Sequence, residues 1–122
     1  MNKERENVIK YALIKLGVKC DLIGFTYLVK AIEIVVEQPL LAYNLKKLFA
    51  AVAKEFNITK IFRVEANIQN AISQAYNANG LHGINEMYGL EIFKPDHKPT
   101  TAEIIKLVAE YYNLGLYKKE AS

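Results

Sequence analysis

The stretch VAKEFNITKIFRVEANIQNAI, residues 52–72, decides how the sequence is interpreted, because it has the pattern of two helices joined by a short turn. Its first part carries Ala53, a small residue across which a second helix can pack closely, and Asn57 favours a turn. Thr59 is expected to cap the helix that follows. This arrangement is typical of a helix-turn-helix, which we predict over about residues 44–78.

The second helix of this stretch is expected to have one apolar side and one polar side. Ile61, Val64, Ile68 and Ile72 recur at helical spacing and form the stripe that should face the core. Arginine can bind guanine in the major groove, glutamine and asparagine can bind adenine, and glutamate can accept from cytosine. The residues left on the other faces are Arg63, Glu65, Ala66, Gln69 and Asn70. The same periodicity also fits two packed helices of a plain scaffold, so both interpretations stay open.

The rest of the chain has helical periodicity, and no strand pattern of useful length appears. We therefore predict an all-α fold and one domain over residues 1–122. Thr100 and Glu103 have the spacing of a capping box at the start of the final helix, and the polar tail, residues 117–122, is expected to fray. The expected helices span residues 4–16, about 26–37, 45–56, about 60–78, a short turn at 84–89, and 100 to about 114.

Composition and charge limit the classes of function without choosing one. The chain has 122 residues, of which 52% are hydrophobic and 24% charged, enough to bury one core. A net charge of +3 permits a polyanionic partner but does not identify one. No apolar run is long enough to cross a bilayer, the first residues are too charged for a secretory signal, and Cys20 has no second cysteine to pair with. We expect a cytoplasmic protein with no membrane role.

Catalysis and metal binding find no support in the sequence. His82 and His97 lie in turn-like stretches, neither is near Cys20, and no pair has the spacing of metal ligands. Because no nucleophile, base and orienting residue can be grouped, we predict no enzyme activity, no catalytic residue, no metal site and no cofactor. His82 is expected in a surface turn, and Asp96 and His97 in a solvated loop.

Several separated motifs occur in the order of a known family. They are LGVKCDLIGFTYLVKAI at 16–32, AKEFN at 53–57, RVE at 63–65, NAISQAY at 70–76, MYG at 87–89 and KPTTAEIIKLVAE at 98–110. In these motifs the chain resembles the C-terminal effector domain of the sporulation master response regulator of endospore-forming bacteria. The resemblance implies a six-helix, all-α domain that binds a promoter element through its helix-turn-helix. It also implies a neighbouring surface that touches the housekeeping sigma subunit of RNA polymerase.

The resemblance assigns roles to residues of the second helix. Arg63 and Glu65 match an arginine and a glutamate that face bases in the family, whereas Ala66 and Gln69 stand where the family has arginines and Asn70 stands where it has a histidine. The chain is also one residue longer than the family between Phe56 and Arg63. The lost cations predict fewer phosphate contacts, and therefore weaker and less salt-sensitive DNA binding.

These observations give a set of candidate site residues and two candidate functions. The first function is a sequence-specific transcription regulator that binds double-stranded promoter DNA, with a dimer on tandem sites as one arrangement that is left open. The second is a protein-interaction module with weakened DNA affinity that binds the sigma subunit or a full-length homologue. Tyr88 matches an aromatic residue of the family's polymerase-facing region and is the candidate for partner binding. The predicted DNA-binding residues are Lys54, Thr59, Lys60, Arg63, Glu65, Ala66, Gln69 and Asn70, with Lys46, Lys47, Lys94 and Lys98 as further cations that could touch phosphate.

The family's regulator also carries an N-terminal receiver domain that accepts phosphate, and this chain has no room for one. We therefore expect either a piece trimmed from a longer protein or a stand-alone effector that receiver phosphorylation cannot switch.

Overall fold

A computed structural model describes residues 2–120, and every regular element in that range is a helix. The prediction of an all-α fold is confirmed. The described range holds seven α-helices where six helices were expected, because a short one follows the expected last helix. The elements are α1 (Lys3–Lys15), α2 (Ile23–Glu37), the 3-10 turn η1 (Pro39–Tyr43), α3 (Leu45–Glu55), α4 (Ile61–Asn77), the 3-10 turn η2 (Leu81–Gly83), α5 (Ile84–Tyr88), α6 (Thr101–Asn113) and α7 (Tyr117–Glu120).

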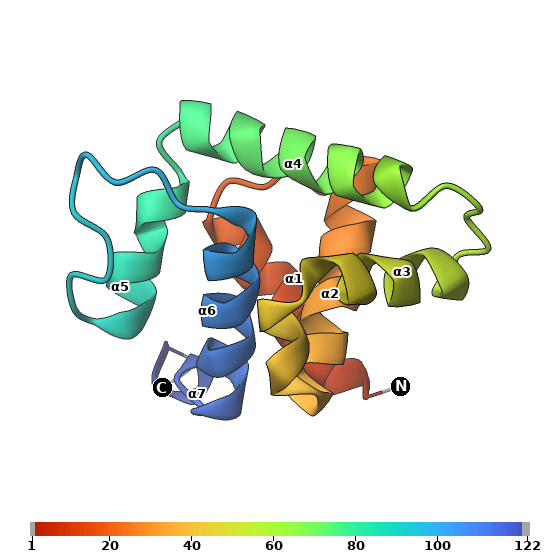
Figure 1. The fold of residues 1–122 in the computed structure, drawn as a ribbon. Coiled ribbons are helices and arrows are strands. Elements are labelled where there is room, and N and C mark those ends of the chain that lie inside the picture. Colours follow the sequence, from red (N-terminus) through yellow and green to blue (C-terminus); the bar gives the residue numbers. More distant parts are fainter. Residues whose placement is uncertain (1, 121–122) are drawn as a thin grey trace.

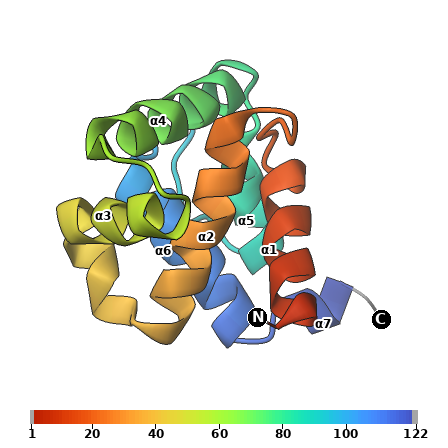
Figure 2. The ribbon, with the colours of Figure 1, turned by 90° about the vertical axis from the view of Figure 1, so that its right-hand side faces the viewer.

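The helix α2 lies at the centre of the bundle. It packs against α1, α3, α4 and α6, and Figure 2 shows it standing between α1 and α3 with α4 crossing above. Leu28, Ala31 and Ile32 in its middle turns have no exposed surface. Burying several branched and aliphatic side chains on one helix stabilises a fold of this size substantially, so α2 is the element on which the others are assembled.

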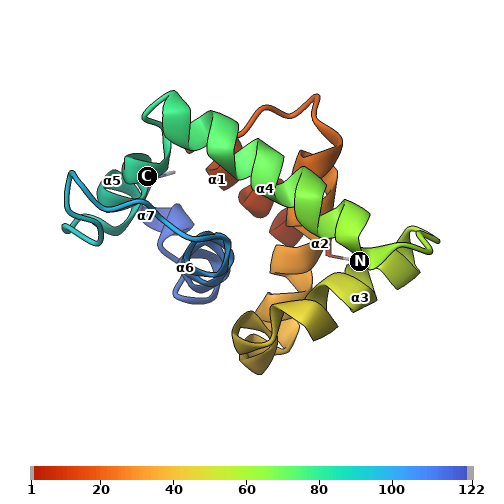
Figure 3. The same cartoon turned by 45° about the horizontal axis from the view of Figure 1, so that its top comes forward.

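The helix α4 crosses one end of the bundle and leaves one long side uncovered (Figures 1 and 3). Its backbone touches α2 closely at Gly24, where a Cβ atom would lie 2.1 Å from the carbonyl oxygen of Asn67. Only glycine fits at that distance, because a real Cβ contact needs more than 3 Å. The start of α2 therefore fixes the middle of α4 in place.

In the turn between α3 and α4, the residue that caps the following helix differs from the predicted one. Asn57 adopts a left-handed conformation with φ 56°, and the amide of Ile58 donates to the carbonyl oxygen of Ala53 at 2.8 Å, which closes α3. The predicted cap at Thr59 is wrong. The residue at the cap position is Lys60, whose backbone is extended and whose side chain makes no capping hydrogen bond. The turn is therefore one residue longer than it would be with the cap at Thr59.

Other helix ends were predicted with mixed success. The capping box of Thr100 and Glu103 is confirmed, with hydrogen bonds in both directions at 3.2 and 2.9 Å. The helix α2 begins three residues before the expected start, at Ile23. The frayed tail is wrong for residues 117–120, because the hydroxyl of Tyr117 donates to Glu4 at 2.8 Å and α7 forms there. Residues 121 and 122 of that predicted tail lie outside the described residues.

Candidate nucleic-acid interface

The predicted helix-turn-helix corresponds to α3, a turn at 56–60 and α4. The two helices pack against each other, and Ala53 near the end of α3 is 2% exposed. Its small side chain leaves room for the following helix to cross closely. Figure 1 shows α4 running over the top of the bundle, with α3 below its N-terminal half.

One side of α4 faces the core and the other faces solvent. The predicted apolar stripe is confirmed for Val64 and Ile68, which are fully buried, and for Ile72, which is 5% exposed. It is wrong for Ile61, which is 38% exposed because it is the first residue of α4, next to the turn. The buried residues of α4 are Val64, Ile68, Ala71, Ile72 and Ala75, and the exposed candidates are Arg63, Glu65, Ala66, Gln69 and Asn70.

The two charged candidates lie on opposite flanks of the exposed face. Residues two apart on an α-helix are separated by about 200° around its axis, so Arg63 and Glu65 cannot point the same way. Glu65 accepts a hydrogen bond from Gln69 at 3.2 Å. The guanidinium of Arg63, in contrast, makes no hydrogen bond or ion pair with any other residue in the described part of the chain. Its five donors are therefore available to a ligand.

The middle of the exposed face is apolar, which the sequence interpretation missed. Phe62 is 63% exposed in the first turn of α4, and Ala66 follows one turn later on the same side. Counting four residues back from Ala66 reaches Phe62, so the helical spacing contained this signal. The candidate site therefore consists of an apolar centre between the flanks of Arg63 and Glu65.

The lysine candidates divide by position. Lys54 and Lys60 are exposed next to the turn, and neither has an acidic partner among the described residues. Lys98 reaches the other end of α4, with its ammonium 5.4 Å from the ring centre of Tyr76. It lines a groove of about 260 Å³ together with Gln69. Cations therefore lie at both ends of the exposed face.

Within residues 2–120, no hydrogen bond, ion pair or ring contact joins the other candidate lysines to α4. Lys46 and Lys47 are exposed in the first turn of α3, where Asn44 caps the helix through the amide of Lys47. Lys94 lies in the loop before α6, and its carbonyl oxygen is 3.0 Å from His82 Nε2. His82, which was expected in a surface turn, lies in the 3-10 turn η2, is half-buried and is tied to that loop.

Tyr88 on α5 has a structural contact of its own. Its hydroxyl donates to the carbonyl oxygen of Leu107 in α6 at 2.6 Å, and the side chain is half-buried. Burial, with a smaller contribution from the charge of Glu110, raises the pKa of Tyr88 well above its ordinary value. The phenol therefore stays protonated at neutral pH and helps to join α5 to α6.

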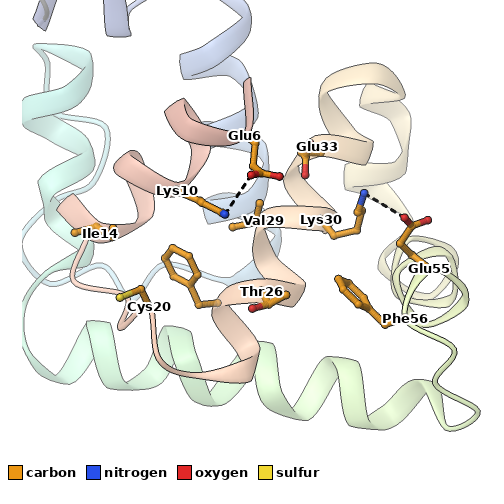
Figure 4. A pocket seen from close by; sticks show the side chains of 11 residues that line it. Glu6, Lys10, Ile14, Cys20, Thr26, Val29, Lys30, Glu33, Glu55 and Phe56 are labelled. Atoms are coloured by element: carbon orange, nitrogen blue, oxygen red, sulfur yellow. Dashed lines mark hydrogen bonds and ion pairs between the residues drawn. The ribbon is translucent and has the colours of Figure 1, made fainter. Parts of the chain in front are cut away.

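Another groove lies away from the exposed side of α4. It measures about 510 Å³ and lies between α1, α2 and the end of α3, with Lys10 paired to Glu6 at 3.2 Å and Lys30 paired to Glu55 at 3.5 Å (Figure 4). Glu33 on α2 is only 5% exposed, and its Oε2 has no hydrogen-bond partner. Burial raises the pKa of this carboxyl. The apolar part of the wall comes from residues such as Phe25, Val29 and Phe56.

The remaining reactive side chains are dispersed. Cys20 is a free, exposed thiol, and His97 pairs with Glu103 through Nε2 at 3.1 Å, so His97 contributes to the start of α6 rather than standing free in the loop. Across residues 2–120, no three His, Cys, Asp or Glu side chains come close enough together to hold a metal ion. In the same part of the chain, no helix has both the length and the apolarity to cross a bilayer.

Comparison with known protein families finds a match over most of the chain. The profile of one family, described as "Sporulation initiation factor Spo0A C terminal", matches residues 9–112. The matched range runs from the first turns of α1 almost to the end of α6 and includes the whole candidate interface.

Proposed function

This chain belongs to the family of Spo0A C-terminal domains, a family of DNA-binding effector domains of transcription regulators, and from that premise we propose that α4 reads a promoter element in double-stranded DNA. In a helix-turn-helix, the second helix enters the major groove and its first turns contact the base edges. The helix α4 occupies the second position here. Family membership supports DNA as the ligand, and the geometry of α4 supports the choice of residues in this proposal.

One observation carries the proposal: Arg63 in the first turn of α4 is exposed and has no protein partner within the described residues. An exposed guanidinium without a carboxylate partner is hydrated, and it can exchange this water for the acceptors of a ligand. A guanidinium at this position can instead bind the O6 and N7 atoms of guanine in two parallel hydrogen bonds. Arg63 is therefore proposed as the main base-reading residue.

The other candidates take supporting roles in the proposal. Gln69 and Asn70 lie one to two turns further along α4 and can bind adenine or phosphate. Thr59, Lys60 and Lys54 surround the turn, next to the positive end of the α4 dipole, where a DNA phosphate would be attracted. Glu65, on the other flank, can accept from the amino group of cytosine. Phosphate contacts of this kind position the helix, while base contacts specify the sequence.

The test begins by selecting binding sequences from a library of random duplexes. The affinity of the selected duplex is then measured at two salt concentrations, because specific binding keeps its preference for the selected sequence while electrostatic binding falls with salt for every sequence. The Arg63→Ala variant should bind the selected duplex about 1 to 3 kcal/mol more weakly and discriminate less at one base pair.

A matched control removes a positive charge from the opposite end of the molecule. Lys118 is exposed on α7, far from α4 in Figure 1, so Lys118→Ala changes the net charge equally without touching the proposed interface. It should bind the selected duplex almost as well as the parent protein. Equal losses for Lys118→Ala and Arg63→Ala would contradict the assignment of Arg63.

A second function is favoured by the neutral residues Ala66 and Gln69, which reduce the charge of the proposed interface. In this alternative the domain binds the sigma subunit of RNA polymerase or a full-length homologue, through a surface that includes Tyr88. Failure to select any duplex, together with saturable binding to the sigma subunit, would favour the alternative. Binding to duplexes with one or two copies of a selected element would show separately whether a dimer forms on tandem sites.

A further inference from the structure

We propose that Phe62 and Ala66 form an apolar reading surface that recognises the C5-methyl group of thymine in the major groove. The proposal rests on the function proposed above and specifies it, since it names the base that the centre of α4 reads. Arg63 and Glu65 would then read bases on either side of that thymine. The polar candidate residues of α4 do not include Phe62, and their side chains read bases through hydrogen bonds rather than through a methyl group.

The position of the two residues is the first argument. The buried side chains of α4, such as Val64, Ile68 and Ala71, lie on one side of the helix, and Ala66 lies on the side directly opposite them. Phe62 is one turn earlier on the same side as Ala66. In any docking that brings the exposed face of α4 to DNA, these two residues approach the bases first.

The exposure of Phe62 is the second argument. Its side chain is 63% exposed, whereas Phe56 in the preceding turn is 37% exposed and packs on Tyr27 with ring centres 5.4 Å apart. No ring contact is found for Phe62 within the described residues. Its neighbour Ile61 is also partly exposed, at 38%. The first turn of α4 therefore presents apolar surface that the fold itself does not use.

The chemistry of the major groove identifies the ligand. Among the four bases only thymine places a methyl group there, and phenylalanine and alanine are side chains that contact it. Neither residue can donate or accept a hydrogen bond through its side chain, so neither can read the polar edges of the other bases. Ala66 is also small, so it lets the helix backbone come near the base pairs while Phe62 extends along them.

The experiment removes single methyl groups from the DNA. In the selected duplex, each thymine is replaced in turn by uracil, which keeps the base pair and every hydrogen-bonding group. The parent protein should lose about threefold to fivefold in affinity at one or two positions, the effect of one buried methyl group. The proposal is overturned if the affinity falls by less than twofold at every thymine that is replaced. It is also overturned if the selected element contains no thymine.

Variants connect the methyl effect to the two residues. Phe62→Ala, which leaves Ala66 in place, should reduce the ratio of the affinities for the thymine and uracil duplexes at the position that the ring contacts. Ala66→Ser, which adds a hydroxyl to the same surface, should reduce this ratio as well. Arg63→Ala should weaken binding to both duplexes and keep the ratio between them. Circular dichroism of each variant checks that the helices form. A ratio unchanged in Phe62→Ala would overturn the proposal even though the parent protein distinguishes the duplexes.

The outcomes separate this proposal from the one on which it rests. Selection of a sequence whose binding depends on Arg63 but not on any methyl group leaves the proposed function standing and overturns the thymine reading. Failure to select any sequence overturns both.

Discussion

The helices α2 and α4 are similar in length but are used in opposite ways. Eight of the fifteen residues of α2 are buried, against five of the seventeen of α4. The wide apolar face of α2 needs partners on several sides, so it lies at the centre of the bundle. The narrow apolar stripe of α4 is buried by packing on one side of the helix, and the rest of the helix surface stays exposed to solvent. The width of the apolar face therefore distinguishes α2, which supports the other helices, from α4, which leaves most of its side chains exposed.

The largest effect is expected where the two helices touch. Gly24→Ala places a Cβ atom 2.1 Å from the carbonyl oxygen of Asn67, so α2 and α4 must separate. We expect a loss of about 3 kcal/mol or more in the free energy of unfolding, measured with urea. The control is Gly83→Ala, whose added Cβ would lie at an ordinary 3.4 Å from the Leu16 side chain. A mild effect of Gly24→Ala would mean that the helices are not held together there.

Truncating one large side chain in each helix sharpens the comparison. Leu28 on α2 has no exposed surface, so Leu28→Ala should cost about 3 kcal/mol through lost burial and the cavity left behind. Phe62 on α4 is larger but mostly exposed, so Phe62→Ala should change the free energy of unfolding by less than about 0.5 kcal/mol. Urea unfolding of both variants checks this. A large loss for Phe62→Ala would show that the ring is part of the core.

An effect smaller than that of Gly24→Ala or Leu28→Ala, and of opposite sign, is expected for Glu33, the one carboxylate that α2 buries. Burial raises the pKa of Glu33, nearby Glu6 adds to this, and Lys30 opposes it together with weaker effects of Arg5 and Lys10. Glu33 therefore destabilises the fold as the pH rises above the ordinary glutamate pKa, where the unfolded chain ionises more readily. At pH 7, Glu33→Gln should raise the free energy of unfolding by about 1 kcal/mol.

This advantage should disappear near pH 4, because glutamate is then protonated in both states. Urea unfolding at the two pH values provides the measurement, and Glu91→Gln, an exposed change in the loop before α6, provides the control. An advantage of equal size at both pH values would show that the effect comes from packing rather than from ionisation.

Much of the fold could be predicted because its signals are local. The stripe of Val64, Ile68 and Ile72 depends only on helical spacing, and the capping box of Thr100 and Glu103 depends on residues three apart. The order of the motifs predicted the family, and the family model that matches residues 9–112 confirms it. These features need no knowledge of which helices touch.

The features that were missed depend on contacts between distant segments. The fit of Gly24 against Asn67 and the burial of Glu33 arise only when α2 is packed, and the short helix α7 is supported by Tyr117 bonding to Glu4 at the other end of the chain. Phe62 is a different case, because a phenylalanine is expected inside and was not considered for the exposed face. Its exposure follows from where α4 meets the bundle.

The tight fit of Gly24 under Asn67 also bears on the proposed DNA complex. A helix seated on another backbone has little freedom to roll or tilt, so in that complex the side chains of α4 would meet the groove in an orientation set before binding. Any mismatch between that orientation and a straight duplex would then be absorbed by bending or twisting of the DNA. Base steps that deform easily, such as TA and CA, would be favoured near the contacted bases even where no side chain reaches them.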